Sequence, residues 1–501
     1  MGIVWLKRGI KHLFLNLILI PRDFLLLLIT STYPLFVWVF TWLPPKYIEW
    51  AGRTRAYRAY YNALNTVPAY RQYIGEKDMP FEEAPETDKE SYIKKFPTEL
   101  RCRDGVFPEK DVMIDESSGS TGTPYNWIRS IKEREQSHKF VSFFSTFCYG
   151  KKPWITINAF SMGAWATGLN MGISLQQNGI VKNTGPDIGK IFNTLRFFGN
   201  KYPYLICGYP PFLKELVDAA KIQKFPLKKF RLNALCGGEG MSEGLRDYLL
   251  EAFDLVYSGY GATDLEIGIA GETPQSVAIR RLASKNPEIR KKLFGTDSRL
   301  PMVFQYNPLM HYIEINKQDE LLFTINRSTV LSPRIRYNIH DKGGIARYDE
   351  MKQKLKDVGI DIDKSAKGEK MIFPFVWVYG RIDYTISVMG ANIYPEDLEH
   401  CIYSDKRLSR ITKSFSLGLD EGKHGSIRPA FYFEITKKPT KRLKEIFKQS
   451  IIKQLIGLNA DFREAWHENK KTLVPNIYLY PTGQGPFKTH TGQIKQVRLV
   501  K

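Results

Sequence analysis

The chain has 501 residues, which is enough for two or three hydrophobic cores. Apolar residues make up 43% and charged residues 25%, so a largely disordered protein is excluded. The formal net charge of +21 favours anionic partners: phosphorylated cofactors, nucleic acid or an acidic membrane surface. The sequence has no zinc-finger spacing or RNA-binding signature, so nucleic acid is not expected. Five scattered cysteines, never spaced C-x-x-C, argue against disulfides and a clustered zinc site and indicate a reducing compartment.

The first 45 residues form an apolar leader. Residues 13–20 are almost entirely apolar, and residues 24–43 carry no charge over a length that can cross a hydrocarbon core of about 30 Å. Pro34 is expected to kink such a helix. Basic residues flank the leader on both sides and choose no orientation, and no small-residue cleavage site follows it. We expect peripheral or monotopic attachment to the cytoplasmic side of a membrane, ahead of a true span or packing on the protein's own core.

Alternating strand and helix patterns follow the leader. A basic, aromatic-rich helix is expected over 46–75, ending near Pro68. From 127 to about 345, short β-like runs alternate with helix-like stretches, which predicts a layered α/β architecture. The last stretch, 384–501, predicts a small α+β domain with a helix that opens at Pro395.

Two motifs combine glycines with groups that suit phosphates. Ser117 to Gly122 reads Ser-Ser-Gly-Ser-Thr-Gly after an expected strand, so backbone N–H groups and hydroxyls can approach phosphates closely. It lacks the Gly-Lys-Ser/Thr ending of a Walker A loop. In the stretch Tyr260 to Asp264, a carboxylate follows a Tyr-Gly turn and suits Mg²⁺. Taken alone, each is more often an ordinary loop or capped turn.

Two further motifs suit the nucleoside. Gly238 and Glu239 form an expected turn that could line a flat base, and the Asp341 carboxylate could accept both ribose hydroxyls. Taken alone, the first is an ordinary turn, and the second is a surface Asp that begins the loop 342–344.

In this order, and with "GRIDYTISVMGANIYPEDLE" at 380–399, the motifs resemble those of the adenylate-forming superfamily of acyl-CoA synthetases. The likeness is greatest to the phenylacetate–CoA ligase branch and its relatives in capsule-polysaccharide clusters. It covers roughly 60–501 and leaves out the leader, 1–45. It implies an α/β fold: a large layered α/β N-terminal adenylation domain over 46–382, joined by a hinge to a small α+β C-terminal domain over 383–501.

The resemblance also implies a role for individual residues. The phosphate-binding loop matches Ser117, Ser118, Gly119, Ser120, Thr121 and Gly122. The adenine-binding positions match Gly238, Glu239, Tyr260 and Gly261. The remaining matches are Thr263 and Asp264 for phosphate and Mg²⁺, Asp341 for ribose, Arg381 for the nucleotide, Asp383 for the hinge and Gly390 for the pantetheine arm.

The implied reaction is the attack of a carboxylate on the α-phosphate of ATP, giving an acyl-adenylate and pyrophosphate. A thiol or amine then displaces AMP, and CoA is the expected acceptor. Catalysis of the first step rests on positioning and on charge neutralisation by Mg²⁺ and cations.

Two departures from the superfamily pattern remove positive charge. Thr123 stands where many relatives have a lysine after the phosphate loop. Gln493 stands where adenylating members place the lysine that bridges the substrate carboxylate and the α-phosphate. If this stretch is extended, Lys495 shares a face with Gln493 and could supply the missing charge as a catalytic residue. Lys488 is a weaker candidate, and reduced adenylation or a changed reaction is the alternative.

Three functions stay open on the sequence. The first is carboxylate activation with transfer to CoA, and the second is transfer to an amine or carbohydrate in polysaccharide or cell-surface biosynthesis. The third is a non-catalytic nucleotide-binding scaffold at the membrane. Tyr209, Phe212 and Met241 could line the acid pocket, although ordinary core packing is the safer expectation for them. The sequence does not choose between an aromatic acid and a fatty acid.

Overall fold

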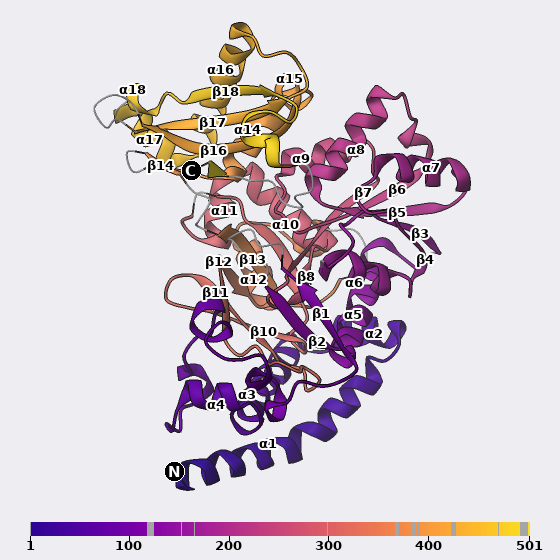
Figure 1. The fold of residues 1–501 in the computed structure, drawn as a ribbon, viewed down its shortest axis with the longest axis vertical. Helices are drawn as coiled ribbons and strands as arrows, with labels where there is room; N and C mark the ends of the chain where they lie inside the picture. The colour runs from indigo at the N-terminus through magenta and orange to yellow at the C-terminus, as the bar shows by residue number, and fades with distance from the viewer. Residues whose placement is uncertain are drawn as a thin grey trace.

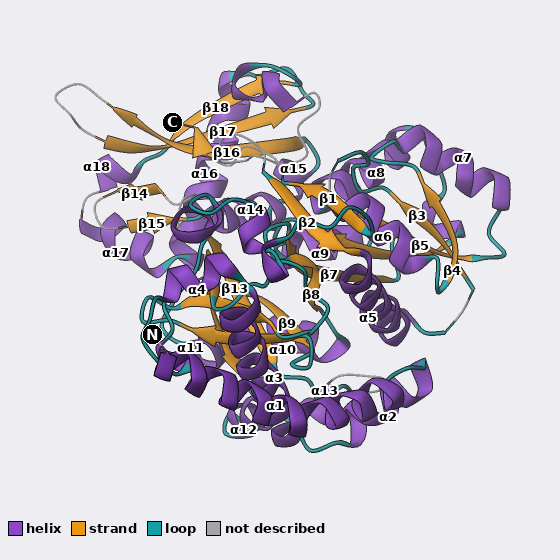
Figure 2. Cartoon of the chain, turned by 60° about the horizontal axis from the view of Figure 1, so that its bottom comes forward, coloured by secondary structure: helices purple, strands orange, loops and turns teal. Residues whose placement is uncertain are grey.

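The computed structural model describes residues 2–117, 125–151, 153–164, 166–297, 299–365, 370–381, 386–388, 391–421, 427–468, 470–490 and 499–500. A large body carries most of the chain, and a smaller unit formed by the residues after 386 sits at one end of it (Figure 1). Helices α1 and α2 lie along the opposite edge of the molecule (Figure 2).

The apolar residues 24–43 do not form one helix; they are divided between two helices. Helix α1 (Gly2–Ile29) passes through Pro21, and α2 (Tyr33–Trp42) has Pro34 in its first turn. Proline is tolerated there because the first-turn N–H has no partner in the helix, so the chain breaks before Pro34 instead of kinking at it. One described helix segment, Gly9–Ile29, is long and apolar enough to cross a membrane by length and composition.

The helix expected over 46–75 is present as two helices that break at the proline. Helix α3 (Pro45–Thr66) is followed directly by α4 (Pro68–Ile74). Short turns then lead into a hairpin; they are η1 (Phe81–Glu83), η2 (Lys89–Ile93), η3 (Glu99–Arg101) and η4 (Arg103–Gly105). The hairpin strands are β1 (Val112–Glu116) and β2 (Asn126–Ser130), which pair antiparallel.

An 11-stranded sheet in the order β10-β11-β12-β13-β9-β8-β7-β6-β5-β3-β4 forms the centre of the body. Neighbours from β4 to β7 are parallel, and neighbours from β7 to β10 are antiparallel. The strands of the parallel half are β3 (Trp154–Asn158), β4 (Gly179–Asn183), β5 (Pro203–Gly208), β6 (Arg231–Gly237) and β7 (Leu255–Ala262). Those of the antiparallel half are β8 (Glu266–Gly271), β9 (Met302–Tyr306), β10 (His311–Ile315), β11 (Glu320–Ile325), β12 (Tyr337–Ala346) and β13 (Phe375–Arg381).

Helices cover both faces of the parallel half, which confirms the predicted layered α/β class. Along β5, Tyr204 and Ile206 pack in the cluster with α7 (Ile188–Phe198), α8 (Pro210–Ile222) and α9 (Glu243–Leu249). Leu205 and Cys207 pack on the other face against α5 (Ile131–Tyr149) and α6 (Ala166–Leu175). A strand with both faces covered reads as a continuous apolar run, as β5 does. The antiparallel half packs against α10 (Pro274–Lys285), α11 (Pro287–Phe294), α12 (Tyr348–Lys356) and α13 (Ile362–Ser365).

The smaller unit has its own apolar core and a four-stranded sheet in the order β18-β17-β16-β19. Its helix α14 opens at Pro395, as predicted. The division expected at Asp383 stays a prediction, because residues 382–385 lie outside the described residues. The strands are β14 (Ile386–Val388), β15 (Ala391–Ile393), β16 (Thr412–Glu421), β17 (Ile427–Ile435), β18 (Asn476–Pro481) and β19 (Leu499–Val500). The helices are α14 (Pro395–Ser404), α15 (Lys406–Ser409), α16 (Lys441–Leu458), α17 (Ala460–Glu468), α18 (Lys470–Leu473) and η8 (Gly485–His490).

The smaller unit docks on α8 and α9 of the body. The Ser242 N–H donates a hydrogen bond to the Glu399 carboxylate at 2.6 Å. The buried Lys214 ammonium donates to the Thr412 carbonyl and to Asp218, both at 2.7 Å. Helix α8 thus reaches the first residue of β16 across the boundary between the two units.

The buried carboxyl group of Asp397 in α14 predicts a pH-dependent stability. Burial raises its pKa to about 7, although hydrogen bonds donated by Asn459 and the Tyr394 N–H oppose the shift. The unfolded state releases this proton near pH 4, whereas the folded state keeps it until about pH 7. The group therefore costs the folded state about 1.4 kcal/mol per pH unit across that window as pH rises. Denaturant unfolding at pH 5 and pH 7.5 should show this slope, and Asp397→Asn should remove it. An unchanged slope in Asp397→Asn would contradict the assignment.

Candidate active site

An apolar cavity of about 130 Å³ opens where the parallel strands of the sheet end. Its rim contains Gly237 and Gly238 at the end of β6, and Tyr260 to Thr263 at the end of β7. Carboxyl ends of parallel strands are the usual ligand-binding edge of an α/β sheet. The predicted adenine and phosphate positions therefore share one rim.

Gly238 lies in a turn where a side chain would clash. Its φ is +83°, and a Cβ there would lie 2.6 Å from the Tyr209 ring. Of the three residues named as possible lining, Tyr209 lines the cavity, while Phe212 and Met241 are not among the lining residues. Met241 is buried in the core of the body instead. Gly238 thus leaves the backbone exposed at the rim, beside the half-buried Glu239.

Tyr260 and Asp341, which are 81 residues apart in sequence, meet at the site. The Tyr260 hydroxyl donates a hydrogen bond to the Asp341 carboxylate at 2.6 Å. Asp341 is not a surface residue at the start of a loop: it lies inside β12 and is 9% exposed. The expected base-stacking ring and the expected ribose carboxylate are therefore neighbours.

The register of the sheet adds Arg381 to this group. Asp341 on β12 pairs directly with Arg381 at the end of β13. The side chain of Arg381 is outside the described part of the structure, so its role stays a prediction. Gly261 follows Tyr260, and a Cβ there would lie 2.9 Å from the Glu266 carbonyl, so the β7–β8 turn closes tightly on itself.

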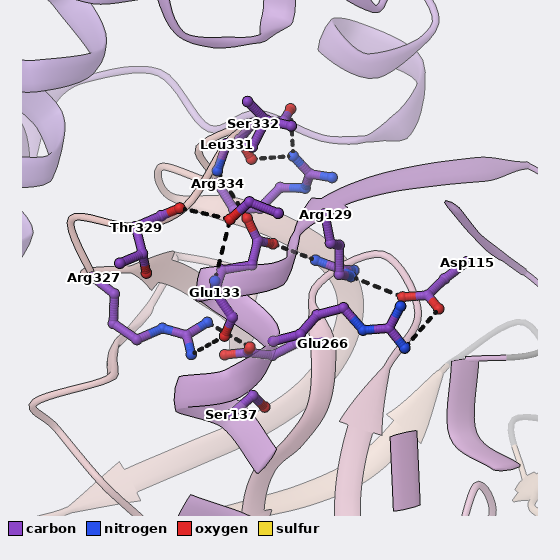
Figure 3. A network of polar contacts seen from close by, with 12 residues as sticks. Asp115, Arg129, Glu133, Ser137, Glu266, Arg327, Thr329, Leu331, Ser332 and Arg334 are labelled. Carbon is purple, nitrogen blue, oxygen red and sulfur yellow. Dashed lines mark hydrogen bonds and ion pairs between the residues drawn. The ribbon is translucent and has the colours of Figure 1, made fainter. Parts of the chain in front are cut away.

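Two arginines hold the backbone of Thr263 and Asp264. Arg129 donates to the Thr263 carbonyl at 2.6 Å, and Arg334 donates to the Asp264 carbonyl at 3.0 Å. Figure 3 shows Arg129 between the carboxylates of Asp115 and Glu133, at 3.3 and 3.5 Å. A network of buried ion pairs thus fixes the turn that presents these two residues.

Glu266, two residues beyond this turn, belongs to the same network and not to the rim. Its carboxylate pairs with Arg327 at 2.5 Å and with His311. Burial acts to raise the pKa of Glu266, but the charges of Arg327 and His311 lower it to about 2. Glu266 is buried in this network and does not line the rim cavity, which leaves Asp264 as the acidic candidate.

The Asp264 carboxylate suits a magnesium ion held mainly by phosphates. It is half-buried, and one of its oxygens accepts a hydrogen bond from Tyr337 at 3.3 Å. No group of three or more His, Cys, Asp or Glu side chains in the described ranges is arranged to hold a metal alone. Mg²⁺ usually takes one or two carboxylates and completes its shell with phosphate and water, so one carboxylate beside a phosphate site fits.

Ser117 closes the base of the expected phosphate loop. Its N–H donates to the Tyr125 carbonyl, and its hydroxyl accepts from the Tyr125 N–H, both at 2.9 Å. These bonds continue the β1–β2 hairpin and bring residues 117 and 125 together.

Seven predicted positions lie outside the described residues; they are Ser118, Gly119, Ser120, Thr121, Gly122, Asp383 and Lys495. The same holds for Thr123, Gly390 and Gln493.

Sequence reasoning missed the walls of the cavity. Helix α5 contributes Phe140, Val141, Phe144, Cys148 and Tyr149, and further lining comes from Phe160, Met171 and Tyr257. The helical spacing of the α5 residues was a usable signal for a buried face, but only the fold shows that this face looks onto the rim.

Solved structures share this fold. A 2-hydroxyisobutyryl-CoA ligase in the postadenylation state superposes with a TM-score of 0.67 and 13% identity, covering 92% of this chain and 91% of that chain. The same ligase with 2-HIB-AMP and CoA in the thioesterification state superposes with a TM-score of 0.54 and 13% identity, covering 92% and 91%. Comparisons with protein-family profiles and with curated protein sequences give no match. The chain therefore has the fold of the adenylate-forming ligases, as predicted.

The buried Lys214 on α8 is one of the residues that hold the smaller unit on the body. The Lys214 bonds described above hold β16 against the body in this arrangement. We expect Lys214→Met to lower the free energy of unfolding by about 1.5 kcal/mol, because a hydrogen bond from a charged group contributes roughly that much. Denaturant unfolding measures this loss. The control is Lys221→Met. Lys221 lies on the same helix, α8, and its ion pair with Glu251 is exposed. An equal loss of stability in both variants would contradict a role for Lys214 in docking the smaller unit.

Proposed function

We propose that this protein activates a carboxylic acid with ATP and passes the acyl group to CoA. In the first step a carboxylate oxygen bonds to the α-phosphorus and pyrophosphate leaves. In the second step the thiol attacks the acyl carbon and AMP leaves. The observation that carries the proposal is the meeting of Tyr260 and Asp341 at the rim that Gly238 shares, over an apolar cavity.

Each described rim residue has a part in this chemistry. Asp341 accepts hydrogen bonds from the ribose hydroxyls, and Tyr260 and Gly238 flank the adenine. Thr263 binds phosphate, and Asp264 helps hold the Mg²⁺ that neutralises the triphosphate. The Lys495 ammonium is proposed to balance the charge that Gln493 does not supply.

The cavity supports an acid whose apolar part is about one aryl ring in size. A dry cavity of roughly 150 Å³ lined by apolar side chains is enough to bind benzene. Several aromatic residues line the walls, including Phe144, Tyr149 and Phe160. Rings pack well against such walls in offset or edge-to-face geometry. A long fatty chain exceeds this volume.

ATP–pyrophosphate exchange across a panel of acids tests the proposal. We expect exchange with benzoate or phenylacetate and at least tenfold less with hexadecanoate. Ser145→Phe, which adds a ring inside the cavity, should abolish exchange with aryl acids. Thr146→Phe, one position along α5 and outside the lining, should not. Absence of exchange with every acid, despite ATP binding, would overturn the proposal in favour of a non-catalytic scaffold.

The acceptor is tested separately with CoA, amines and sugars. CoA is proposed because the fold shared with the 2-hydroxyisobutyryl-CoA ligase covers 92% of this chain. Formation of an amide or a sugar ester without any acyl-CoA would favour the alternative in cell-surface biosynthesis.

We also propose that α1 and α2 lie against an anionic membrane surface. Their outward side is apolar: Leu17 is 73% exposed and Trp42 is 75% exposed. The inward side of α1 carries Asp23, which is paired with arginines of the body. A surface helix in water turns its apolar side inward and its charged side outward, and α1 does the reverse. The net charge of +21 complements the negative charge of acidic lipid.

Vesicle flotation measures this surface contact. Full-length protein should float with vesicles containing phosphatidylglycerol, and Leu17→Glu should reduce the floated fraction severalfold. Ile222→Glu is the matched control, because Ile222 is 78% exposed on α8 of the body. A loss that is equal in both variants would contradict a membrane role for α1.

A further inference from the structure

A second cavity, of about 550 Å³, lies between the N-terminal helices and the body. Helices α1, α2, α3 and α5 contribute its walls, and its volume is typical of small-molecule sites. It is distinct from the cavity at the strand ends, although Phe140 of α5 lines both.

Positive charge exceeds negative charge in the lining of this cavity. Five cationic side chains line it: Arg55, Arg58, Arg103, Lys139 and Arg327. Within the described residues, the one lining carboxylate is that of Asp23. That carboxylate is already shared among three guanidinium groups, those of Arg22 at 2.8 Å, Arg55 at 3.0 Å and Arg58 at 2.8 Å. Buried charges in folded proteins are normally paired, so this surplus calls for an anion.

Two of these arginines have N–H donors without an acceptor among the described residues, which also favours a bound anion. The Nε atoms of Arg103 and Arg327 are buried and have no hydrogen-bond acceptor in the described parts of the chain. Arg327 pairs through another nitrogen with Glu266, whereas Arg103 has no ion pair with any described residue. Burial lowers the pKa of Arg103, and it also lowers those of Arg55 and Arg58 against the opposing effect of Asp23. Unfilled donors of this kind are costly unless a ligand occupies them.

The other part of the lining is apolar. It comes mainly from α1, α2 and α5; its members include Phe24, Leu26, Phe36, Phe40, Phe140 and Phe143. The cationic side chains come chiefly from α3, η4 and residue 327. The cavity thus combines a basic part with an apolar part, which is the complement of an amphiphile.

We propose that this cavity binds an anionic amphiphile, with its phosphate or carboxylate headgroup at Arg103 and Arg327, beside Arg55 and Arg58, and its hydrocarbon chain among the phenylalanines. The proposal does not rest on the adenylation reaction. It places a lipid-like ligand beneath α1, the helix whose outer side is apolar.

Binding to the full-length, delipidated protein tests the site, without ATP and without vesicles. The probes are hexadecyl phosphate, hexadecanoate, hexadecanol and inorganic phosphate, measured by native mass spectrometry and thermal shift. We expect one hexadecyl phosphate or hexadecanoate per chain, with a rise in Tm. The headgroup that binds tighter distinguishes a phospholipid source from a fatty acid source. Hexadecanol and inorganic phosphate should each bind at least tenfold more weakly.

Arg103→Gln is the decisive variant. It should weaken binding of the anionic probes about tenfold, because a charged hydrogen bond of roughly 1.5 kcal/mol is lost. It should not lower the Tm of the ligand-free protein, since the Arg103 guanidinium has no ion pair with a described residue and its buried Nε has no acceptor there. Lys190→Gln makes the same change in net charge at an exposed site, 62% of that side chain being accessible, and should bind normally. Hexadecanol binding as tightly as hexadecyl phosphate, or equal binding by Arg103→Gln and Lys190→Gln, would overturn the proposal.

Discussion

Replacing Arg246 by methionine is expected to lower the free energy of unfolding by about 3–5 kcal/mol. Arg246 is 1% exposed on its side chain and pairs with Glu272 at 2.5 Å and Glu243 at 3.1 Å. Glu243 also pairs with Arg280 and Arg281, so it keeps partners in the variant. The Glu272 carboxylate keeps only the hydrogen bond from the Ser258 N–H, at 2.8 Å, among the described residues. An uncompensated carboxylate in the core is the source of the loss.

Denaturant unfolding of the double variant Arg246→Met/Glu272→Gln isolates that cause. If the stranded charge is responsible, the second substitution should restore at least half of the lost stability. A double variant that is less stable than Arg246→Met would contradict the explanation, and would indicate lost packing instead.

Replacing Asp341 by asparagine is expected to reduce kcat/KM for ATP in acid-dependent exchange roughly 100-fold. The carboxylate is proposed to accept two charge-assisted hydrogen bonds from ribose, and their loss costs about 3 kcal/mol. An amide oxygen can still accept the bond from Tyr260, so the rim should stay folded.

The nucleotide 2′-deoxy-ATP makes this prediction specific. Wild-type protein should discriminate against it, whereas Asp341→Asn should treat it nearly like ATP. Asp319→Asn, an equivalent change in an exposed turn of the same sheet, should behave as wild type. Retained discrimination in Asp341→Asn would show that another group reads the ribose.

The fold could be predicted well where local patterns agree with tertiary packing. Apolar runs such as that of β5 and the Pro395 helix start are local signals, and both are present in the structure.

The apolar leader was predicted less well. Its composition is apolar almost throughout, so nothing local showed that the helix would break before Pro34 or that Asp23 would face the body.

The site could be predicted only in part, for a related physical reason. Order along the chain made Tyr260 and Asp341 candidates, but their hydrogen bond depends on strands far apart in sequence. The arginines that hold the β7–β8 turn, Arg129 and Arg334, lie outside every motif, because buried ion pairs are made by tertiary contacts. The same is true of the basic cavity under α1.

Isotope transfer tests the proposed adenylation most directly. The acid that supports the fastest exchange is labelled with ¹⁸O in both carboxylate oxygens and incubated with ATP, Mg²⁺ and CoA. Attack of the carboxylate on the α-phosphorus predicts AMP that carries one ¹⁸O atom, formed together with acyl-CoA. AMP without label, or ADP as the nucleotide product, would contradict carboxylate activation through an acyl-adenylate.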